Sequence, residues 1–232
     1  MGLGCYSGTQ TGGFEIMFLT IVTRCCQRPQ KLSEGIASIK AQTCHDLEQI
    51  YIPDRARRGI HVADRALAKS AGRVDGEFVY ILDDDCMLID REFVEKVRDT
   101  VGEYDPDIVM VKSRRPPGPP NGRSLVPVVW EKPLYHGACN CLCYVMRAEL
   151  WKRHIEAYGW HKWGGDWWFL EQALAEKPRM YWLDRIVADA RQLGRGKIFE
   201  GVREGWFERV MEECGGEDLG NDDWRLRLWM RD

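Results

Sequence analysis

Long hydrophobic runs and a strong charge of either sign are both missing from this sequence. No stretch approaches the ~20 consecutive apolar residues of a membrane-spanning helix, so no transmembrane segment is expected. The formal net charge at pH 7 is only −3, which gives no global attraction to nucleic acid or to an anionic membrane. With 232 residues, 44% hydrophobic and 30% charged, the chain has the composition of a globular protein long enough for one large α/β domain.

The cysteines lack the paired Cys-x-x-Cys spacing of zinc sites, so we do not expect them to bind metal. Their number, nine, is odd and does not define a disulfide framework. Cys139, Cys141 and Cys143 alternate along residues 139–146, which we predict to be a strand with the three thiols on one face as small hydrophobes. Free thiols of this kind indicate a reducing, cytoplasmic compartment.

The first 16 residues have neither the basic start nor the apolar centre of a secretory signal peptide. They are rich in Gly, Ser and Thr, and we interpret them as a loose leader before a single domain over residues 17–232. The sequence has no internal repeat. Its strongest breaker, the proline- and glycine-rich segment 116–122, predicts a stiff loop that divides the domain into halves over residues 17–113 and 127–232.

Strand and helix patterns alternate through the first half of the chain. Short apolar runs predict strands, and apolar residues at helical spacing predict helices. The strands are expected over 17–23, 47–53, 77–82 and 107–112, and the helices over 33–43, 62–71 and 90–102. After the strand at 139–146 we expect helices over 148–158, 166–177 and 200–214, a strand over 180–188 and a docked tail. The alternation is typical of an α/β fold with a Rossmann-like, mainly parallel central sheet and helices on both faces.

The strand expected over 77–82 runs directly into three carboxylates, Asp83, Asp84 and Asp85. Open α/β sheets bind their ligands at the carboxyl ends of the strands. Adjacent carboxylates repel one another unless a cation is bound, and a divalent cation carrying phosphates is the candidate. The alternative is an acidic turn without a ligand. Because neighbouring strand residues point to opposite faces, we expect at least one of the acids to be structural.

Four stretches of the sequence follow one another in a characteristic order and at characteristic separations. The first is Leu19 to Thr43, in which Thr23 ends the first strand and Arg24 begins the loop after it, and the second is Asp54, after the second strand. The third runs from Arg65-Ala-Leu-Ala through Gly76-Glu77 to the three acids, and the fourth is Gly164-Gly165-Asp166-Trp167. Together they resemble glycosyltransferases of the GT-A fold, in particular the large inverting family two. The resemblance covers about residues 17 to 175. It implies a GT-A type fold with a nucleotide-sugar-binding half before the proline-rich loop and an acceptor half after it.

The resemblance implies a metal-dependent, inverting transfer of a sugar from a UDP- or GDP-linked donor to a hydroxyl group. Asp85 would hold a divalent cation, Mn²⁺ or Mg²⁺, and Asp83 would join the metal's shell or bind the ribose. Asp189 is the candidate for a third metal ligand, and Asp84 would assist in donor binding or turn away. Thr23 and Arg24 would lie beside the nucleobase of the donor, and Asp54 would accept a hydrogen bond from the nucleobase N–H. Arg65 would contact the diphosphate. Arg58 would also contact it or be a solvated surface charge.

On the acceptor side, the resemblance implies that Asp166 is the base that takes the proton from the attacking hydroxyl. The alternative for Asp166 is a structural cap at the start of its helix. Nearby tryptophans would form a stacking platform for the acceptor, a glycan or glycoconjugate, and we expect about two of the four to face the site. Trp163 and Trp167 are the candidates, with Trp160, Trp168 and the polar His136 close by in the sequence.

The sequence departs from the family pattern at three points. Gly165 stands where the family commonly has Glu, which removes an acid that helps to bind the acceptor. Ala66 stands where an Asn commonly follows the arginine of the second helix. No histidine clearly matches the one that often supplies a third protein ligand to the metal. These departures leave the metal geometry and the acceptor class open.

Three other functions remain to be distinguished. A nucleotidyltransferase would carry a Gly-rich loop after the first strand, whereas residues 24–29 contain no glycine. A non-catalytic module would bind a nucleotide sugar without turnover, which the departures at Ala66 and Gly165 permit. A glycosyltransferase acting on nucleic-acid bases would use the basic runs 55–58 and 114–115 on phosphates, and the slightly acidic chain disfavours it.

Overall fold

The structure, a computed structural model, describes residues 17–54, 60–115, 125–161, 164–191, 204–220 and 224–228. The expected leader, Arg58, the proline-rich segment and Trp163 lie outside these residues. None of the helices in the described part of the chain is long and apolar enough to cross a membrane.

Apolar runs from the first half of the chain form the centre of the sheet. The strand β1 (Leu19–Cys25) lies between β2 (Leu47–Pro53) and β3 (Phe78–Ile81), and both pairings are parallel. Every residue of β3 is buried. Continuous burial of this kind is typical of a strand that is covered on both faces, as the sequence predicts.

Strands from the second half of the chain extend the sheet beyond β3 on one side and beyond β2 on the other. The strand β7 (Tyr144–Arg147) is antiparallel to both β3 and β5 (Ile108–Arg114), and β8 (Met180–Ala190) is parallel to β5. The expected docked tail is β10 (Trp224–Leu228), antiparallel to β2. The order is β4-β8-β5-β7-β3-β1-β2-β10-β9, with β6 beside β5; β4 is Cys86–Leu88, β6 Leu125–Val126 and β9 Glu217–Asp218.

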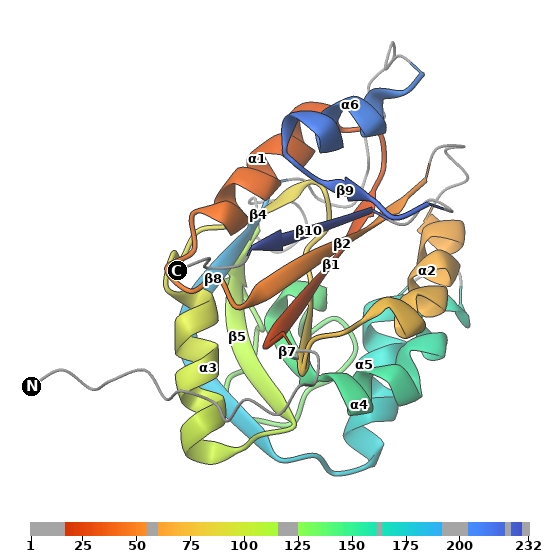
Figure 1. Cartoon of the computed structure of the whole chain (residues 1–232). Coiled ribbons are helices and arrows are strands. Elements are labelled where there is room, and N and C mark those ends of the chain that lie inside the picture. Colours follow the sequence, from red (N-terminus) through yellow and green to blue (C-terminus); the bar gives the residue numbers. More distant parts are fainter. Residues whose placement is uncertain are drawn as a thin grey trace, which may run out of the picture.

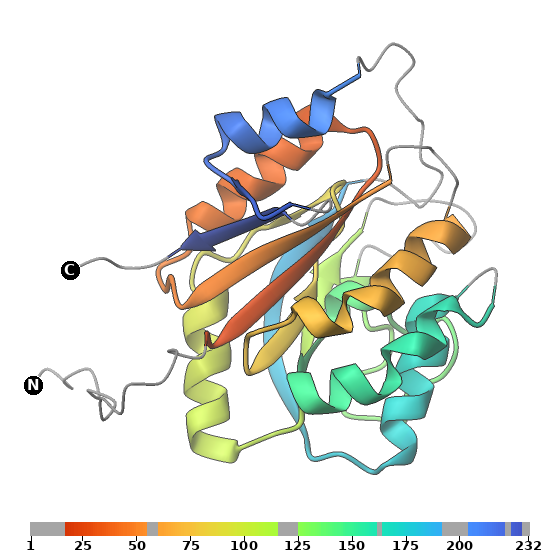
Figure 2. The same ribbon diagram turned by 45° about the vertical axis from the view of Figure 1, so that its right-hand side comes forward.

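Helices cover the sheet in two groups (Figures 1 and 2). One group is α1 (Pro29–Lys40), α3 (Phe93–Tyr104) and α6 (Trp206–Glu213). The other is α2 (Ile60–Lys69), α4 (Ala148–His154) and α5 (Gly165–Ala175), with the 3₁₀ turns η1 (Ser70–Arg73) and η3 (Ile155–Gly159). The predicted α/β sheet with helices on both faces is therefore confirmed.

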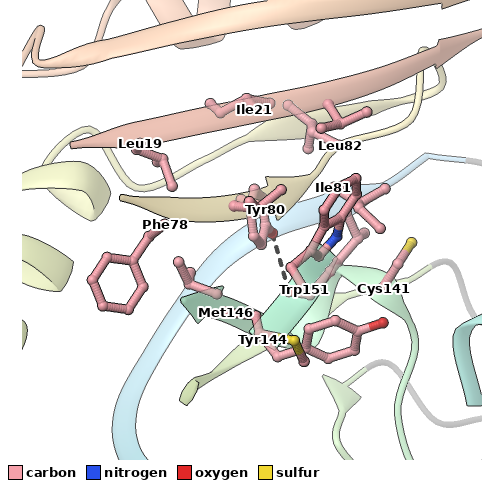
Figure 3. Packing of buried hydrophobic residues seen from close by; sticks show 14 of the residues in the cluster. Leu19, Ile21, Phe78, Tyr80, Ile81, Leu82, Cys141, Tyr144, Met146 and Trp151 are labelled. Atoms are coloured by element: carbon pink, nitrogen blue, oxygen red, sulfur yellow. Dashed lines mark hydrogen bonds between the residues drawn. The ribbon is translucent and has the colours of Figure 1, made fainter. Parts of the chain in front are cut away.

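The main core lies between the sheet and both groups of helices (Figure 3). The buried ring of Tyr80 lies 4.9 Å from that of Phe93 in α3, and its hydroxyl donates to the carbonyl of Leu142 at 3.0 Å. Trp151 of α4 is 1% exposed and packs in the same cluster. Aromatic side chains from β3, α3 and α4 thus belong to one buried cluster.

The strand predicted over residues 139–146 is wrong in its first half. Cys141–Cys143 form a 3₁₀ turn, η2, and the strand begins only at Tyr144. The side chain of Asn140 accepts a hydrogen bond from the backbone N–H of Leu142 at 3.1 Å, which stabilises the turn against the extended conformation. The three thiols therefore do not alternate along a strand.

The turn before β3 packs directly against β1, and Gly76→Ala is expected to destabilise the fold. A Cβ at Gly76 would lie 2.6 Å from the backbone nitrogen of Thr20, an overpacking that costs about 1–3 kcal/mol. Gly102→Ala in α3 is the control, because a Cβ there meets no atom within 4 Å and should add about 0.5–1 kcal/mol of stability. Urea unfolding measures both changes, and equal stability of the two variants would contradict this packing.

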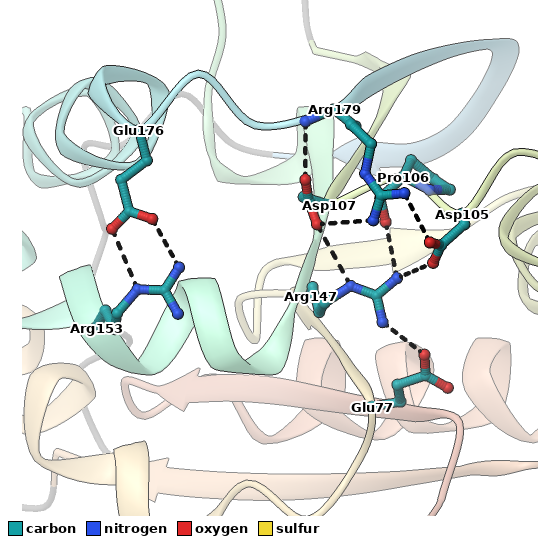
Figure 4. A network of polar contacts seen from close by, with 8 residues as sticks. All are labelled: Glu77, Asp105, Pro106, Asp107, Arg147, Arg153, Glu176 and Arg179. Atoms are coloured by element: carbon teal, nitrogen blue, oxygen red, sulfur yellow. Dashed lines mark hydrogen bonds and ion pairs between the residues drawn. The ribbon is translucent and has the colours of Figure 1, made fainter.

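An ion-pair network joins the two halves of the chain at the amino ends of the strands (Figure 4). Arg147 donates to Glu77 Oε1 at 2.8 Å and to Asp105 Oδ1 at 2.7 Å, and Arg179 donates to Asp105 Oδ2 at 2.7 Å. Exposed pairs of this kind contribute about 0–1 kcal/mol each. We therefore regard the network as structural, on the edge of the sheet opposite to the acids after β3.

Candidate active site

The carboxyl ends of β1, β2 and β3 bring several predicted residues to one edge of the sheet. The backbone ladder continues past β3, because the N–H of Asp84 donates to the carbonyl of Arg24 at 3.1 Å. On the other side of β1, the N–H of Asp54 donates to the carbonyl of Cys25 at 2.8 Å. This is the edge at which open α/β sheets bind their ligands.

The side chain of Arg24 is held between two aspartates. Its Nε and Nη2 donate to the two carboxylate oxygens of Asp83, each at 2.7 Å, and its Nη1 donates to Oδ1 of Asp64 in α2. The ring centroid of Tyr158, in η3, lies 5.5 Å from the guanidinium carbon. We call Arg24, Asp64 and Asp83 the Arg24 cluster. Its bidentate pair is the strongest geometry for an arginine and a carboxylate.

Asp64 is the deeply buried member of this cluster, at 2% exposed. Burial raises the pKa of Asp64 to about 6, Arg24 lowers it, and the charges of Asp83 and Asp166 raise it. The side chain of Asp83 is 23% exposed, so it is the member open to solvent. The cluster therefore has one acid beneath Arg24 and one acid at the surface.

A second arginine engages the other two acids after β3. Arg28 Nη1 donates to Oδ1 of Asp84, and the backbone N–H of Cys26 donates to its Oδ2 at 2.5 Å. Burial raises the pKa of Asp84 to about 7, although Arg28 and the Cys26 N–H lower it. Since both oxygens of Asp84 bind the loop after β1, the geometry favours the expectation that one of the three acids is structural.

Asp85 is less well neutralised than its neighbours. Its Oδ2 lies 3.7 Å from Arg28 Nη1, and its Oδ1 lies 3.5 Å from the Cys86 thiol. Burial raises the pKa of Asp85, the charge of Asp83 raises it further, and Arg28 lowers it. Ionised Asp85 is thus unfavourable in this environment, and a cation beside it would relieve the repulsion.

Within the described ranges, no three or more His, Cys, Asp or Glu side chains form a group that could hold a metal ion. Asp189 is half-buried on β8, opposite Met87 in the ladder. Asp85 still fits a divalent ion such as Mn²⁺ or Mg²⁺, because Mg²⁺ typically uses one or two carboxylates and takes its other ligands from phosphates and water. Asp83 could join it only where Arg24 gives up or shares its carboxylate. The incomplete neutralisation of Asp85 is the observation that favours a cation there.

Asp166 lies in the first turn of α5, within the electric field of the Arg24 cluster. Burial raises the pKa of Asp166. The N–H of Trp167, which donates to Oδ1 at 2.9 Å, and then the charge of Arg24 lower it. The N-cap position of α5 is Gly164 rather than Asp166. Asp166 therefore does not occupy the N-cap position, although its Oδ1 accepts an N–H in the first turn of the helix. A carboxylate with a raised pKa is also suited to accept a proton.

The departure at Gly165 has a packing cause. A Cβ at Gly165 would lie 2.6 Å from the carbonyl oxygen of Tyr158 and 2.7 Å from its ring. The first turn of α5 is therefore in direct contact with η3, and a glutamate could not be accommodated without moving one of them. The absence of the family's acid at this position follows from this close approach.

Aromatic rings gather next to Asp166. The ring of His136 lies 6.1 Å from that of Trp167 and 6.2 Å from that of Trp168, and the ring of His161 lies 4.4 Å from that of Trp168. The charge of His136 also lowers the pKa of Asp166. Trp167 and Trp168 are half-buried, whereas Trp160 is 57% exposed.

Three predicted donor contacts differ in how accessible they are. Thr23 is 1% exposed, and its hydroxyl accepts a hydrogen bond from Gln49 at 2.7 Å. Asp54 is also buried, at 6% exposed. Arg65 is exposed, and its stem lies against Gly159, where a Cβ would be 3.2 Å from its Cγ. The arginine that binds Asp83 is Arg24 rather than Arg65.

Asp64, Arg28 and Tyr158 belong to the site but were not predicted. A signal for Asp64 was available, because it precedes the buried Leu67 by three residues and so lies on the same face of α2. Arg28 and Tyr158 come from a loop and from a 3₁₀ turn, where periodicity gives no direction for a side chain.

The fold is similar to those of two proteins of known structure. One is a fragment of TarS from S. aureus in complex with UDP-GlcNAc, with a TM-score of 0.59 and 13% sequence identity. The match covers 85% of this chain and 65% of that chain. The other is the mannosyltransferase PcManGT from Pyrobaculum calidifontis in complex with GDP-Man and Mn²⁺, with a TM-score of 0.52 and 13% sequence identity. The match covers 79% of this chain and 58% of that chain. The chain thus spans less than two thirds of either. No family profile and no curated protein matches the sequence. The predicted GT-A type fold is confirmed.

Proposed function

We propose that the protein is a metal-dependent, inverting glycosyltransferase that moves a sugar from a nucleotide-sugar donor to a hydroxyl of a glycan or glycoconjugate. One observation carries the proposal. Asp83, after β3, and Asp166 of α5, predicted at the donor and acceptor ends, both interact with Arg24: Asp83 accepts its hydrogen bonds, and its charge acts on Asp166. The likeness to folds that were determined with UDP-GlcNAc and with GDP-Man and Mn²⁺ supports it.

On the donor side, Asp83 and Asp85 are the acids that would meet the diphosphate end of the donor. A divalent ion held there would neutralise the charge that develops on the leaving diphosphate. Asp54 lies on the far side of β1 at the same edge, where it would receive the N–H of the base. Asp84 stays with Arg28 and fixes the loop after β1.

On the acceptor side, Asp166 is the base. As the acceptor oxygen attacks the anomeric carbon, its proton passes to a carboxylate oxygen of Asp166. The bond from the anomeric carbon to the phosphate oxygen breaks, and the diphosphate leaves with the electron pair. Attack from the face opposite to the leaving group inverts the configuration. Trp167 and Trp168, which follow Asp166 in α5, would stack against the acceptor sugar.

The proposal is tested by incubating the protein with UDP-GlcNAc or GDP-Man, Mn²⁺ and a panel of glycan acceptors. We expect donor consumption that stops when a chelator removes the cation, and a product of inverted anomeric configuration by NMR. Retention of configuration, or turnover that is insensitive to the chelator, would contradict the mechanism. Donor binding with neither transfer nor hydrolysis would favour a non-catalytic binding module instead.

A nucleic-acid acceptor is the other outcome of the acceptor panel. Residues 55–58 lie outside the described residues, so the basic surface proposed for that function remains a prediction. Transfer to an oligonucleotide that weakens steeply as salt rises would favour it over a glycan acceptor.

A further inference from the structure

The guanidinium of Arg24 occupies both carboxylate oxygens of Asp83. Its Nε and Nη2 each donate at 2.7 Å. A cation or a ribose hydroxyl that binds Asp83 must therefore displace Arg24 or share the carboxylate with it. The resting Arg24–Asp83 pair and the donor compete for the same atoms.

Losing Asp83 would be costly for Arg24 if it had no second partner. Its side chain is only 11% exposed, and a buried cation without a counter-charge is strongly unfavourable. Asp64 supplies that second partner from α2, because it accepts from Nη1 and not from the two nitrogens that bind Asp83. The two aspartates thus hold different donors of one guanidinium.

Release of Asp83 would leave Nε and Nη2 of Arg24 free at the same edge of the sheet. These two donors form a planar fork that suits a diphosphate oxygen pair. The ring of Tyr158, 5.5 Å from the guanidinium carbon, supports the side chain from another direction. The guanidinium can therefore change partners without leaving its place.

We propose that Asp64 is a positioning residue, which holds Arg24 in the site while the guanidinium exchanges Asp83 for the donor diphosphate. The inference rests on the proposed function and deepens it. It assigns the diphosphate contact to Arg24 rather than to Arg65, and it explains why an acid is buried in α2 beneath the acids of β3.

The test is calorimetric titration of UDP-GlcNAc with Mn²⁺, or of GDP-Man with Mn²⁺ if only that donor binds. In Asp64→Asn, Asp83 is the remaining anion of the cluster for Arg24, so the resting pair tightens and the donor Kd is expected to rise about tenfold, the worth of one charged hydrogen bond. Turnover at saturating donor should change little. Asp64→Glu should restore part of the affinity. Asp90→Asn is the matched control. Asp90 is a half-buried acid, and it accepts hydrogen bonds from Nε and Nη2 of Arg185 elsewhere on the sheet.

A double-mutant cycle separates positioning from general damage to the fold. If Asp64 acts through Arg24, Asp64→Asn should change the donor Kd by less than about twofold when Arg24 is already Gln. This double variant also removes both buried charges together, so it should fold even if Asp64→Asn alone does not. A tenfold loss in the Arg24→Gln background, or an unchanged Kd in Asp64→Asn, would overturn the positioning role.

The pH dependence of donor binding gives a second readout. Burial raises the pKa of Asp64 to about 6, and Arg24, Asp83 and Asp166 are the charged groups that act on it. Protonation below that pH releases Arg24, so the wild-type Kd should rise as pH falls through about 6, and this component should be missing from Asp64→Asn. Identical profiles would contradict the proposal. If neither donor binds the wild-type protein, the proposed function itself fails. If a donor binds but Asp64→Asn changes neither its Kd nor its pH profile, only the positioning role of Asp64 fails.

Discussion

Asp85→Ala is expected to abolish cation-dependent donor binding while leaving the fold intact. A cation that holds the diphosphate contributes several kcal/mol, so transfer should fall by about 100-fold or more. The thermal midpoint should be unchanged or higher, because burial and Asp83 both make ionised Asp85 unfavourable. The measurements are donor titration with and without Mn²⁺, initial rates and thermal unfolding.

Asp90→Asn is the control for this variant as well. Its side chain is 10% exposed against 13% for Asp85, and it also pairs with an arginine. It should keep the cation dependence of donor binding. Cation-dependent binding that persists in Asp85→Ala, or a fall in stability without a change in binding, would show that Asp85 is a structural acid.

Asp166→Asn is expected to retain donor binding and to lose transfer. The amide keeps the oxygen that accepts the Trp167 N–H at 2.9 Å, so the first turn of α5 should be preserved. Without a proton acceptor, the rate should fall by about 10²–10⁴-fold. Donor Kd from titration and single-turnover rates with saturating donor separate the two effects.

Glu171→Gln on the same helix is the matched control, and it should transfer sugar at the wild-type rate. Full activity of Asp166→Asn would refute its role as the base. Equal loss of donor binding and of transfer would instead indicate that Asp166 supports the Arg24 cluster.

The architecture followed from hydrophobic patterning where the segments are long. β2 has the predicted bounds, and α1, predicted from apolar residues at helical spacing, buries Leu32, Ile36 and Ile39. Strands of two or three residues, such as β4, are too short for periodicity to detect. The prediction for the first half of 139–146 failed because the hydrogen bond that the Asn140 side chain accepts from the Leu142 N–H stabilises a turn despite the alternating pattern.

The positions of the candidate site residues along the chain could be predicted from the order of the motifs. The directions in which their side chains point could not. Asp83, Asp85 and Asp166 are at the edge and helix start that the resemblance implies. Motif order does not give the direction of a side chain, because successive residues of a helix point about 100° apart: Asp64 accepts a hydrogen bond from Arg24, whereas the neighbouring Arg65 is exposed. The diphosphate contact implied for Arg65 stays a prediction beside the contact that we propose for Arg24.

If the proposed function is correct, the acids after β3 form a cation-dependent donor site. A thermal-shift titration of the wild-type protein with UDP-GlcNAc and GDP-Man, with and without Mn²⁺, tests it most directly. At a 100-fold excess over Kd, a ligand that binds only the folded state adds about 2.7 kcal/mol, or roughly 5–10 °C for a chain of this size. We expect such a shift for at least one donor, only with Mn²⁺ present and not in Asp85→Ala. A shift of equal size without the cation, or in the variant, would contradict it.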